Sequence, residues 1–186
     1  MKRIICVYNP KSRGGSFAQL WQEFTNLLDD AEDIDCDLLE VADGNLGDRL
    51  TGRLLEDSGD YSTVTGGDGT HCALINALLR FQKSHPERRP ISYLPIPFGT
   101  GNDIAKSVGF KPGRGCVPSA VQAIPGGGEH RRDLGRWRSL YFADAFSIGL
   151  DVAILATHNA MEAALGQRAA DCSVYRAATW SMRQAP

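Results

Sequence analysis

The chain has 186 residues and a formal net charge of −2, with 42% hydrophobic and 23% charged residues. Such a composition is ordinary for a globular protein, and the balanced charge gives no general attraction to nucleic acid, so we expect no nucleic-acid partner and a local site for any anionic ligand. The length allows one complete domain and part of a second.

Further classes of protein are disfavoured by the spacing of the cysteines and histidines and by the length of the apolar runs. The five cysteines include no Cys-x-x-Cys pair, and an odd number cannot all be bridged within the chain, which favours reduced thiols and a cytoplasmic location. The four histidines have no metal-ligand spacing with these cysteines, so a zinc site is not expected. Since no apolar run reaches the length of a membrane span, any membrane contact should be peripheral.

The first part of the chain alternates between two patterns. Short apolar runs with β-prone residues indicate strands, and stretches with apolar residues every three or four positions indicate helices. The alternation predicts an α/β fold with an open parallel sheet and flanking helices on both faces. We predict strands over 3–8, 34–41, 61–65 and 91–96, and helices over 17–28, 46–56, 70–81, 104–108 and 116–124.

The segment Pro125-Gly-Gly-Gly128 interrupts this alternation and predicts a domain boundary at 125–130. Residues 1–128 would form a nucleotide-binding α/β domain, and residues 129–186 the start of a C-terminal domain. Within the latter, 130–137 and 140–148 suggest an antiparallel strand pair, and 152–182 is helical by composition. Fewer than sixty residues follow the boundary, so we expect this second, β-rich domain to be incomplete.

Three turns follow predicted strands, and the carboxyl ends of parallel strands meet at one edge of a sheet. The turns are Asn9-Pro-Lys-Ser-Arg-Gly-Gly15, Gly66-Gly-Asp-Gly-Thr70 and Pro97-Phe-Gly-Thr-Gly-Asn-Asp103. Glycine lets the backbone approach a ligand closely, and the N–H groups at the start of the following helix attract anions. Together these features predict one nucleotide-phosphate site. The aspartates, which repel phosphate, suggest a bridging Mg²⁺ or a hydrogen bond to ribose or backbone.

Neither the P-loop pattern nor the dinucleotide pattern G-x-G-x-x-G occurs, so the two common nucleotide folds are disfavoured. The three turns instead resemble, in order and spacing, the catalytic domain of diacylglycerol, sphingosine and related lipid kinases. Two later segments, Asp133-Leu-Gly-Arg-Trp137 and Phe142-Ala-Asp-Ala-Phe-Ser-Ile-Gly149, are similar to that family's passage into its second domain. Taken by itself, the second turn is shared with NAD kinases and resembles the phosphofructokinase loop. The third turn narrows the choice of family to the lipid kinases.

The resemblance implies an NAD kinase-like or phosphofructokinase-like sheet and an ATP-dependent lipid kinase of phospholipid metabolism. ATP would be the phosphate donor, Mg²⁺ the cofactor, and a diacylglycerol-like lipid hydroxyl at a membrane surface the acceptor. Asp68 is the implied catalytic and metal-binding residue, and Lys11 the implied point charge beside the phosphates. The implied nucleotide-binding residues are Asn9, Pro10, Lys11, Ser12, Gly14, Gly66, Gly67, Asp68, Gly69, Thr70, Gly99, Thr100, Asn102 and Asp103.

Other interpretations stay open. Asp103 is explained equally well as a helix cap, and His71 as a first-turn helix residue with no catalytic duty. The chain has His71-Cys-Ala73 where relatives commonly have a small apolar residue, Asn and Glu, and it lacks the Asp-Gly-Glu sequence that supplies the family's acidic base. The alternatives are a soluble-substrate kinase of the NAD kinase type and a non-catalytic nucleotide-binding fragment. The sequence also leaves open a homodimer and the identity of the acceptor lipid.

Overall fold

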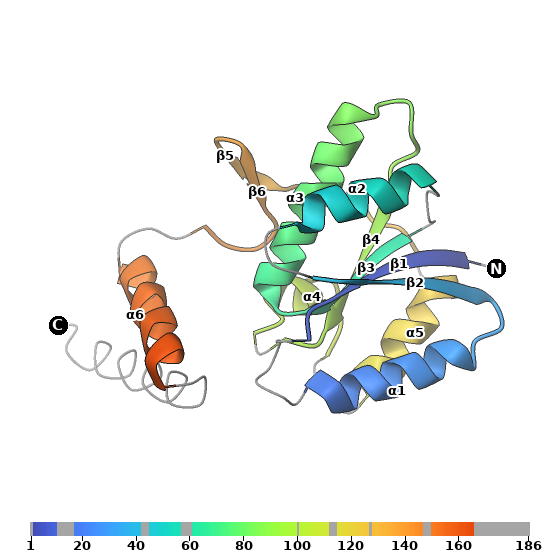
Figure 1. Ribbon diagram of the computed structural model, residues 1–186, viewed down its shortest axis with the longest axis horizontal. Coiled ribbons are helices and arrows are strands. Elements are labelled where there is room, and N and C mark those ends of the chain that lie inside the picture. The colour runs from blue at the N-terminus through green and yellow to red at the C-terminus, as the bar shows by residue number, and fades with distance from the viewer. Residues whose placement is uncertain are drawn as a thin grey trace. The chain divides into compact units, whose positions relative to one another are not determined.

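The computed structural model describes residues 2–10, 17–41, 45–56, 61–99, 101–111, 115–126, 128–146 and 150–165, which group into two compact units within Met1–Asp144 and Ala145–Pro186 (Figure 1). The elements are β1 (Lys2–Tyr8), α1 (Phe17–Asp29), β2 (Ile34–Glu40), α2 (Leu46–Glu56), β3 (Tyr61–Gly66), α3 (Asp68–Ser84), β4 (Ser92–Pro97), α4 (Asp103–Ser107), α5 (Cys116–Gly126), β5 (Gly135–Trp137), β6 (Leu140–Phe142) and α6 (Leu150–Leu165).

The first unit contains a parallel sheet with the strand order β2-β1-β3-β4. The connection from β1 to β2 runs toward one edge of the sheet, whereas the connections from β2 to β3 and from β3 to β4 run toward the other edge. Because parallel crossovers are right-handed, this reversal places α1 on one face and α2 and α3 on the opposite face. It also creates a topological switch point between β1 and β3, where open α/β proteins bind ligands at the carboxyl ends of the strands. The predicted open parallel sheet with flanking helices is confirmed.

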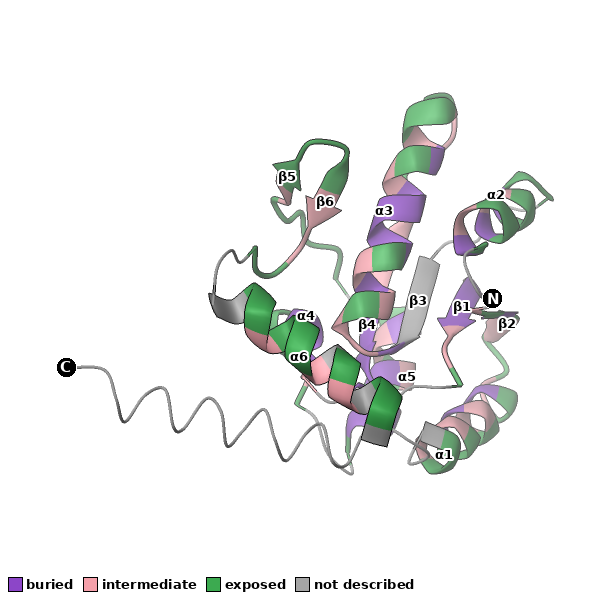
Figure 2. Ribbon diagram, turned by 60° about the vertical axis from the view of Figure 1, so that its left-hand side comes forward, coloured by how far each residue is buried: buried purple, intermediate pink, exposed green. Residues whose placement is uncertain are grey.

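Both faces of β1 are buried, as its continuous apolar run requires. Successive residues of β1 point to opposite faces: Ile4 and Cys6 join one core, Ile5 and Val7 the other, and none of the four is more than 2% exposed. The helices α1 and α5 cover the first face, and α2 and α3 cover the second. Figure 2 shows the buried residues of the sheet and of the helix sides that cover it.

The helix predicted over 70–81 begins earlier, at Asp68. The Gly67 carbonyl accepts hydrogen bonds from the N–H groups of Thr70 and His71, at 2.9 and 3.1 Å, so the glycine turn runs directly into the helix. The predicted antiparallel pair is present but short, with Gly135 opposite Phe142. The helix predicted over 152–182 corresponds in part to α6, and its residues beyond 165 lie outside the described part of the chain. The division at residue 128 stays a prediction.

None of the helices in the described ranges combines the length and the apolar character needed to cross a membrane.

The β5–β6 hairpin is attached to α3 by the buried side chain of Asn76. Its Nδ2 donates to the carbonyl oxygens of Tyr141 and Cys72, at 2.8 and 2.9 Å, and its Oδ1 accepts from the Tyr141 N–H at 2.8 Å. The amide thus pairs with both backbone groups of Tyr141, as a neighbouring strand would.

Replacing Asn76 by alanine should lower the free energy of unfolding by about 1–3 kcal/mol, because it leaves part-buried backbone groups of Tyr141 without these partners. Urea unfolding measures the loss, and faster hydrogen exchange at the Tyr141 amide should locate it. Gln22→Ala is the control, since it removes only an exposed bond to Asn26 and should change stability by less than about 0.5 kcal/mol. A Tyr141 exchange rate equal to that of the unsubstituted protein would contradict the anchoring role of Asn76.

Candidate functional site

Three turns converge at the switch point between β1 and β3. Asn9 follows β1, and its Nδ2 donates to Thr70 Oγ1 in the first turn of α3, at 3.4 Å. The turn after β4 reaches the same place, because Gly99 lies against Gly67. The structure therefore brings the described parts of the three glycine-containing turns to one end of the sheet.

Gly67 and Gly99 make a direct backbone contact. A Cβ built on Gly99 would lie 2.3 Å from the Gly67 Cα, which is closer than real Cβ atoms come to a neighbour, and 3.0 Å from the Gly66 carbonyl oxygen. The φ of Gly99 is outside the left-handed region, so glycine is needed here for space rather than for backbone conformation. A second close contact, between Gly66 and the Thr70 side chain, holds the start of α3 against the end of β3.

Asn102 holds the shape of the turn after β4. It lies in the left-handed region, with φ 58° and ψ 34°, which asparagine tolerates better than most residues. Its Oδ1 accepts from the Gly99 N–H at 2.6 Å, and its Nδ2 donates to the Gly99 carbonyl at 2.5 Å. With 1% of its surface exposed, Asn102 directs its amide at Gly99 and so supports the turn from within.

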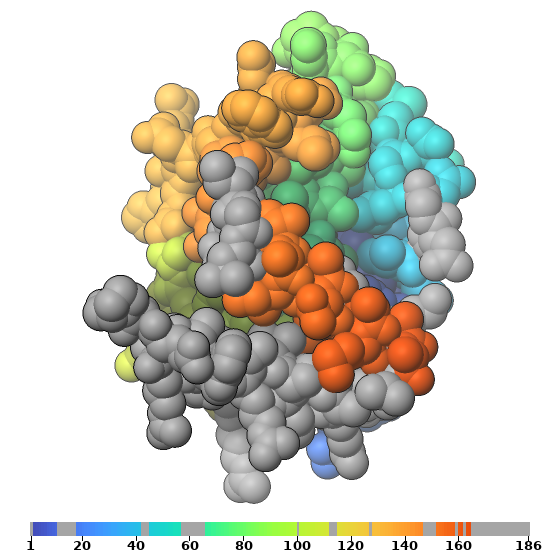
Figure 3. Space-filling model, turned by 90° about the vertical axis from the view of Figure 1, so that its left-hand side faces the viewer, coloured from blue at the N-terminus to red at the C-terminus, as the bar shows by residue number. Residues whose placement is uncertain are grey.

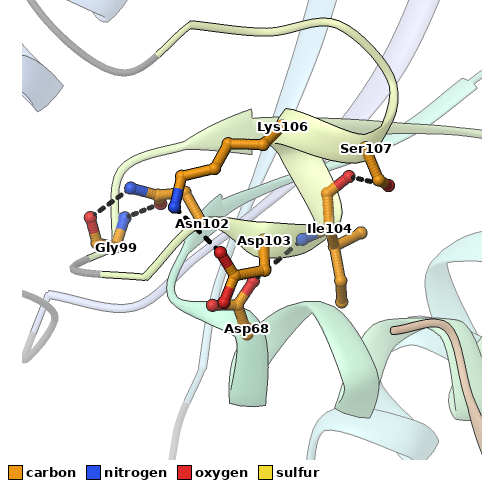
Figure 4. A network of polar contacts seen from close by, with 7 residues as sticks. All are labelled: Asp68, Gly99, Asn102, Asp103, Ile104, Lys106 and Ser107. Atoms are coloured by element: carbon orange, nitrogen blue, oxygen red, sulfur yellow. Dashed lines mark hydrogen bonds and ion pairs between the residues drawn. The ribbon is translucent and has the colours of Figure 1, made fainter. Parts of the chain in front are cut away.

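The carboxylates of Asp68 and Asp103 lie at the starts of α3 and α4 (Figure 4), and both are near Gly101. Asp68, the first residue of α3, accepts a hydrogen bond from the Ile104 N–H through Oδ1, at 3.2 Å. A Cβ built on Gly101 would lie 2.7 Å from Asp68 Oδ2 and 3.6 Å from Asp103 Oδ2. Lys106 binds the other oxygen of Asp103 at 2.8 Å, and this bond raises the pKa of the lysine.

Carboxylates are the type of ligand that a magnesium ion takes when it shares its coordination with phosphate and water. Mg²⁺ takes oxygen ligands and is commonly held by one or two carboxylates together with substrate phosphates. Asp68 and Asp103 supply such oxygens from two different helices, and the Oδ2 atoms of both lie within 4 Å of the place that a Cβ on Gly101 would take. Over the described residues there is no group of three or more His, Cys, Asp or Glu side chains that could enclose a metal.

The buried His71 and the half-buried Tyr93 form a pair next to this site. His71 Nδ1 makes a hydrogen bond with the Tyr93 hydroxyl, and the rings meet edge to face. Burial lowers the pKa of His71 to about 4, although the Asp68 charge acts in the opposite direction. Burial, and then the charges of Asp68 and Cys72, raise the pKa of the Tyr93 hydroxyl. Both side chains are therefore neutral at pH 7.

The sequence motifs indicated no role for His71 in the site. Helical periodicity does place His71 on the core-facing side of α3, because Leu74 and Leu78, at positions i+3 and i+7, are buried. A histidine on that face needs a polar partner inside the protein. The pattern could not say that the partner is Tyr93 on another element.

The predicted site residues are thus placed as follows. Gly69, in the first turn of α3, is exposed, and a Cβ built on it would meet nothing within 4 Å. Pro10 is exposed after β1. Lys11, Ser12, Gly14 and Thr100 lie outside the described residues. The described residues that the structure brings together at the switch point are Asn9, Gly66, Gly67, Asp68, Thr70, Gly99, Asn102 and Asp103.

The fold is that of an open parallel α/β protein, with the candidate site at its topological switch point. The sequence model of the diacylglycerol kinase catalytic domain matches residues 3–137, most of the chain. The chain belongs to this family, as its three turns predicted. None of the curated proteins compared with the chain matches it significantly.

Solved structures support the same fold. A provisionally assigned diacylglycerol kinase from Bacillus anthracis strain Sterne is 22% identical, with a TM-score of 0.51, and the match covers 66% of this chain and 41% of that one. A crystal structure of a diacylglycerol kinase from the same strain is 21% identical, with a TM-score of 0.52, and the match covers 67% of this chain and 40% of that one. The chain therefore corresponds to about two fifths of the length of these proteins.

Proposed function

We propose that this chain holds the ATP-binding part of a lipid kinase of the diacylglycerol kinase type. The complete reaction would transfer the γ-phosphate of ATP to a lipid hydroxyl at a membrane surface, in cytoplasmic phospholipid metabolism. The observation that supports this best is the meeting of the α3 N-terminus, the Gly67–Gly99 contact and the Asp68–Asp103 pair at the switch point, in a chain of this family.

The start of α3 is suited to hold phosphate. A helix leaves its first N–H groups without intrahelical acceptors, and their partial positive charge attracts anions. In α3 the N–H groups of Thr70 and His71 bond to the Gly67 carbonyl, so those of Asp68 and Gly69 precede the first helical bonds. The open space beside Gly69 gives a phosphate access to them.

The carboxylates need a counter-charge before a triphosphate can approach. Mg²⁺ bound through Asp68, with Asp103 beside it, would supply that charge and would offset the negative charge on the transferring phosphoryl group. Asp68 keeps one oxygen on the Ile104 N–H, which orients its second oxygen toward Gly101. The chain's own contribution is thus alignment of the donor and placement of charge.

Thermal unfolding with Mg·ATP tests the proposal. A concentration one hundred times the dissociation constant should add about 2.7 kcal/mol to the stability of the chain. Asp68→Asn keeps an oxygen for the Ile104 N–H but loses the charge, and should weaken Mg·ATP binding by about tenfold or more. Asp48→Asn, the same change in the first turn of α2, is the matched control and should bind as the unsubstituted protein does. Equal affinity in all three proteins would rule out the site.

The acceptor is tested separately. Transfer of label from γ-labelled ATP to diacylglycerol in mixed vesicles, with NAD as the competing acceptor, distinguishes a lipid kinase from a kinase of the NAD type. We expect any label that is transferred to appear in the lipid fraction. Label in NAD phosphate would contradict the lipid assignment. Mg·ATP binding without transfer to either acceptor would instead support the alternative of a non-catalytic nucleotide-binding chain.

A further inference from the structure

His71 is a fully buried polar residue in the first turn of α3, three positions after Asp68. Its Nδ1 is hydrogen-bonded to the Tyr93 hydroxyl on β4, and the ring centroids are 6.0 Å apart at an interplanar angle of 78°. An apolar side chain would fill the same place without the cost of burying polar atoms. The pair therefore calls for an explanation other than core packing.

Tyr93 bonds one of the two ring nitrogens of His71, Nδ1. Nε2 is buried and has no hydrogen-bond partner among the described residues. The backbone carbonyls of Gly66 and Ile96 raise the pKa of His71 against the larger effect of burial, so both strand segments lie close to the imidazole. Since carbonyl oxygens only accept, this arrangement favours the tautomer with hydrogen on Nε2 and with Nδ1 accepting from Tyr93.

Both carbonyl groups belong to segments that lead into the candidate site. Gly66 ends β3 and precedes Gly67, and Ile96 lies three residues before Gly99. Gly67 and Gly99 are the residues whose backbones touch, and the Gly66 oxygen is 3.0 Å from the place of a Cβ on Gly99. One imidazole thus lies among α3, the end of β3 and the end of β4.

We propose that His71, held by Tyr93, is a positioning residue for the nucleotide site. The ring sets the separation between the ends of β3 and β4, and through it the place of Gly67 and Asp68 relative to Gly99. His71 is fully buried and so acts through the backbone, without touching the ligand. The role in nucleotide binding rests on the proposed function, whereas the effect on the two turns can be measured without nucleotide.

Tyr93→Phe is the most conservative test, because it removes one oxygen and keeps the ring. Mg·ATP affinity, measured by titration calorimetry, should fall about 3- to 10-fold, the usual range for residues that act through a packed network. The amide resonances of Gly67 and Gly99 should also shift in nitrogen–proton spectra recorded without nucleotide. Leu54→Ala is the matched control, since Leu54 is a fully buried core residue of α2. The Leu54→Ala protein should be less stable than the unsubstituted protein, but its Mg·ATP affinity and its Gly67 and Gly99 resonances should be unchanged.

The outcomes are distinct. Unchanged affinity together with unchanged Gly67 and Gly99 resonances in Tyr93→Phe would overturn the proposal, and so would equal changes in Leu54→Ala. If the unsubstituted protein does not bind Mg·ATP, the proposed function fails, and the resonances alone decide whether the pair positions the turns. If Tyr93→Phe does not fold, the double variant His71→Leu/Tyr93→Phe replaces it, because exchanging both partners for apolar groups leaves neither unpaired, and the same losses are expected.

Discussion

Replacing Gly99 by alanine is expected to lower the free energy of unfolding by at least about 3 kcal/mol. The new Cβ would lie 2.3 Å from the Gly67 Cα and 3.0 Å from the Gly67 nitrogen. These are backbone atoms at the junction of β3 and α3, so they cannot turn away as a side chain would. Relief requires the two strand ends to separate, which removes the contact between the turns.

Urea and thermal unfolding measure the effect. For a domain of about 150 residues, a loss of 3 kcal/mol corresponds to a fall in Tm of about 6–12 °C. Gly52→Ala, in the middle of α2, is the control, because a Cβ there meets nothing within 4 Å. The control should gain about 0.5–1 kcal/mol, since alanine is the better helix former. A Gly99→Ala protein as stable as the unsubstituted one would show that the turns do not touch.

Acidification from pH 7 to pH 4 should remove about 3 kcal/mol of stability through His71 alone. Burial lowers the pKa of His71 from its ordinary value of 6.5 to about 4 in the folded protein. Between these values the unfolded chain binds a proton that the folded chain does not, so stability falls as the pH falls. The contribution is complete above pH 6.5 and is lost progressively down to the folded pKa, near pH 4.

The double variant His71→Leu/Tyr93→Phe separates this effect from the titration of carboxylates. Without an imidazole, the variant should show a shallower dependence of unfolding free energy on pH between 6.5 and 4, measured by urea unfolding at half-unit steps. The slope below pH 4 should be the same in both proteins, because it comes from acidic groups that the substitutions leave in place. Parallel curves between pH 6.5 and 4 would contradict a buried neutral histidine.

The contacts between the three turns could be known only from the folded structure. Their sequences predicted a shared site, since turns after parallel strands meet at one edge of a sheet. They did not indicate that Gly99 must fit against Gly67, or that the amide of Asn102 bonds to Gly99. Both contacts depend on how far β3 and β4 extend before they turn.

The attachment of the hairpin shows a similar limit. An antiparallel pair near residues 130–148 was predicted from its apolar runs and the polar turn between them. An asparagine that helps to anchor it, Asn76, is 65 residues away from Tyr141 in sequence. Nothing in a helical pattern distinguishes an asparagine that faces solvent from one that binds a distant backbone.

By itself, the sequence determined the strand and helix alternation, the parallel sheet and the family, because these depend on periodicity and on short motifs that are local in the chain. The tertiary structure alone decided which side chains meet: His71 with Tyr93, 22 residues apart, and Asp68 with the backbone of Ile104, 36 residues apart. The physical reason is that burial and hydrogen bonding act between residues that are close in space, and strand order sets those neighbours. Amino-acid patterns alone do not give the distances between such residues, because those distances depend on how the strands are arranged in the sheet.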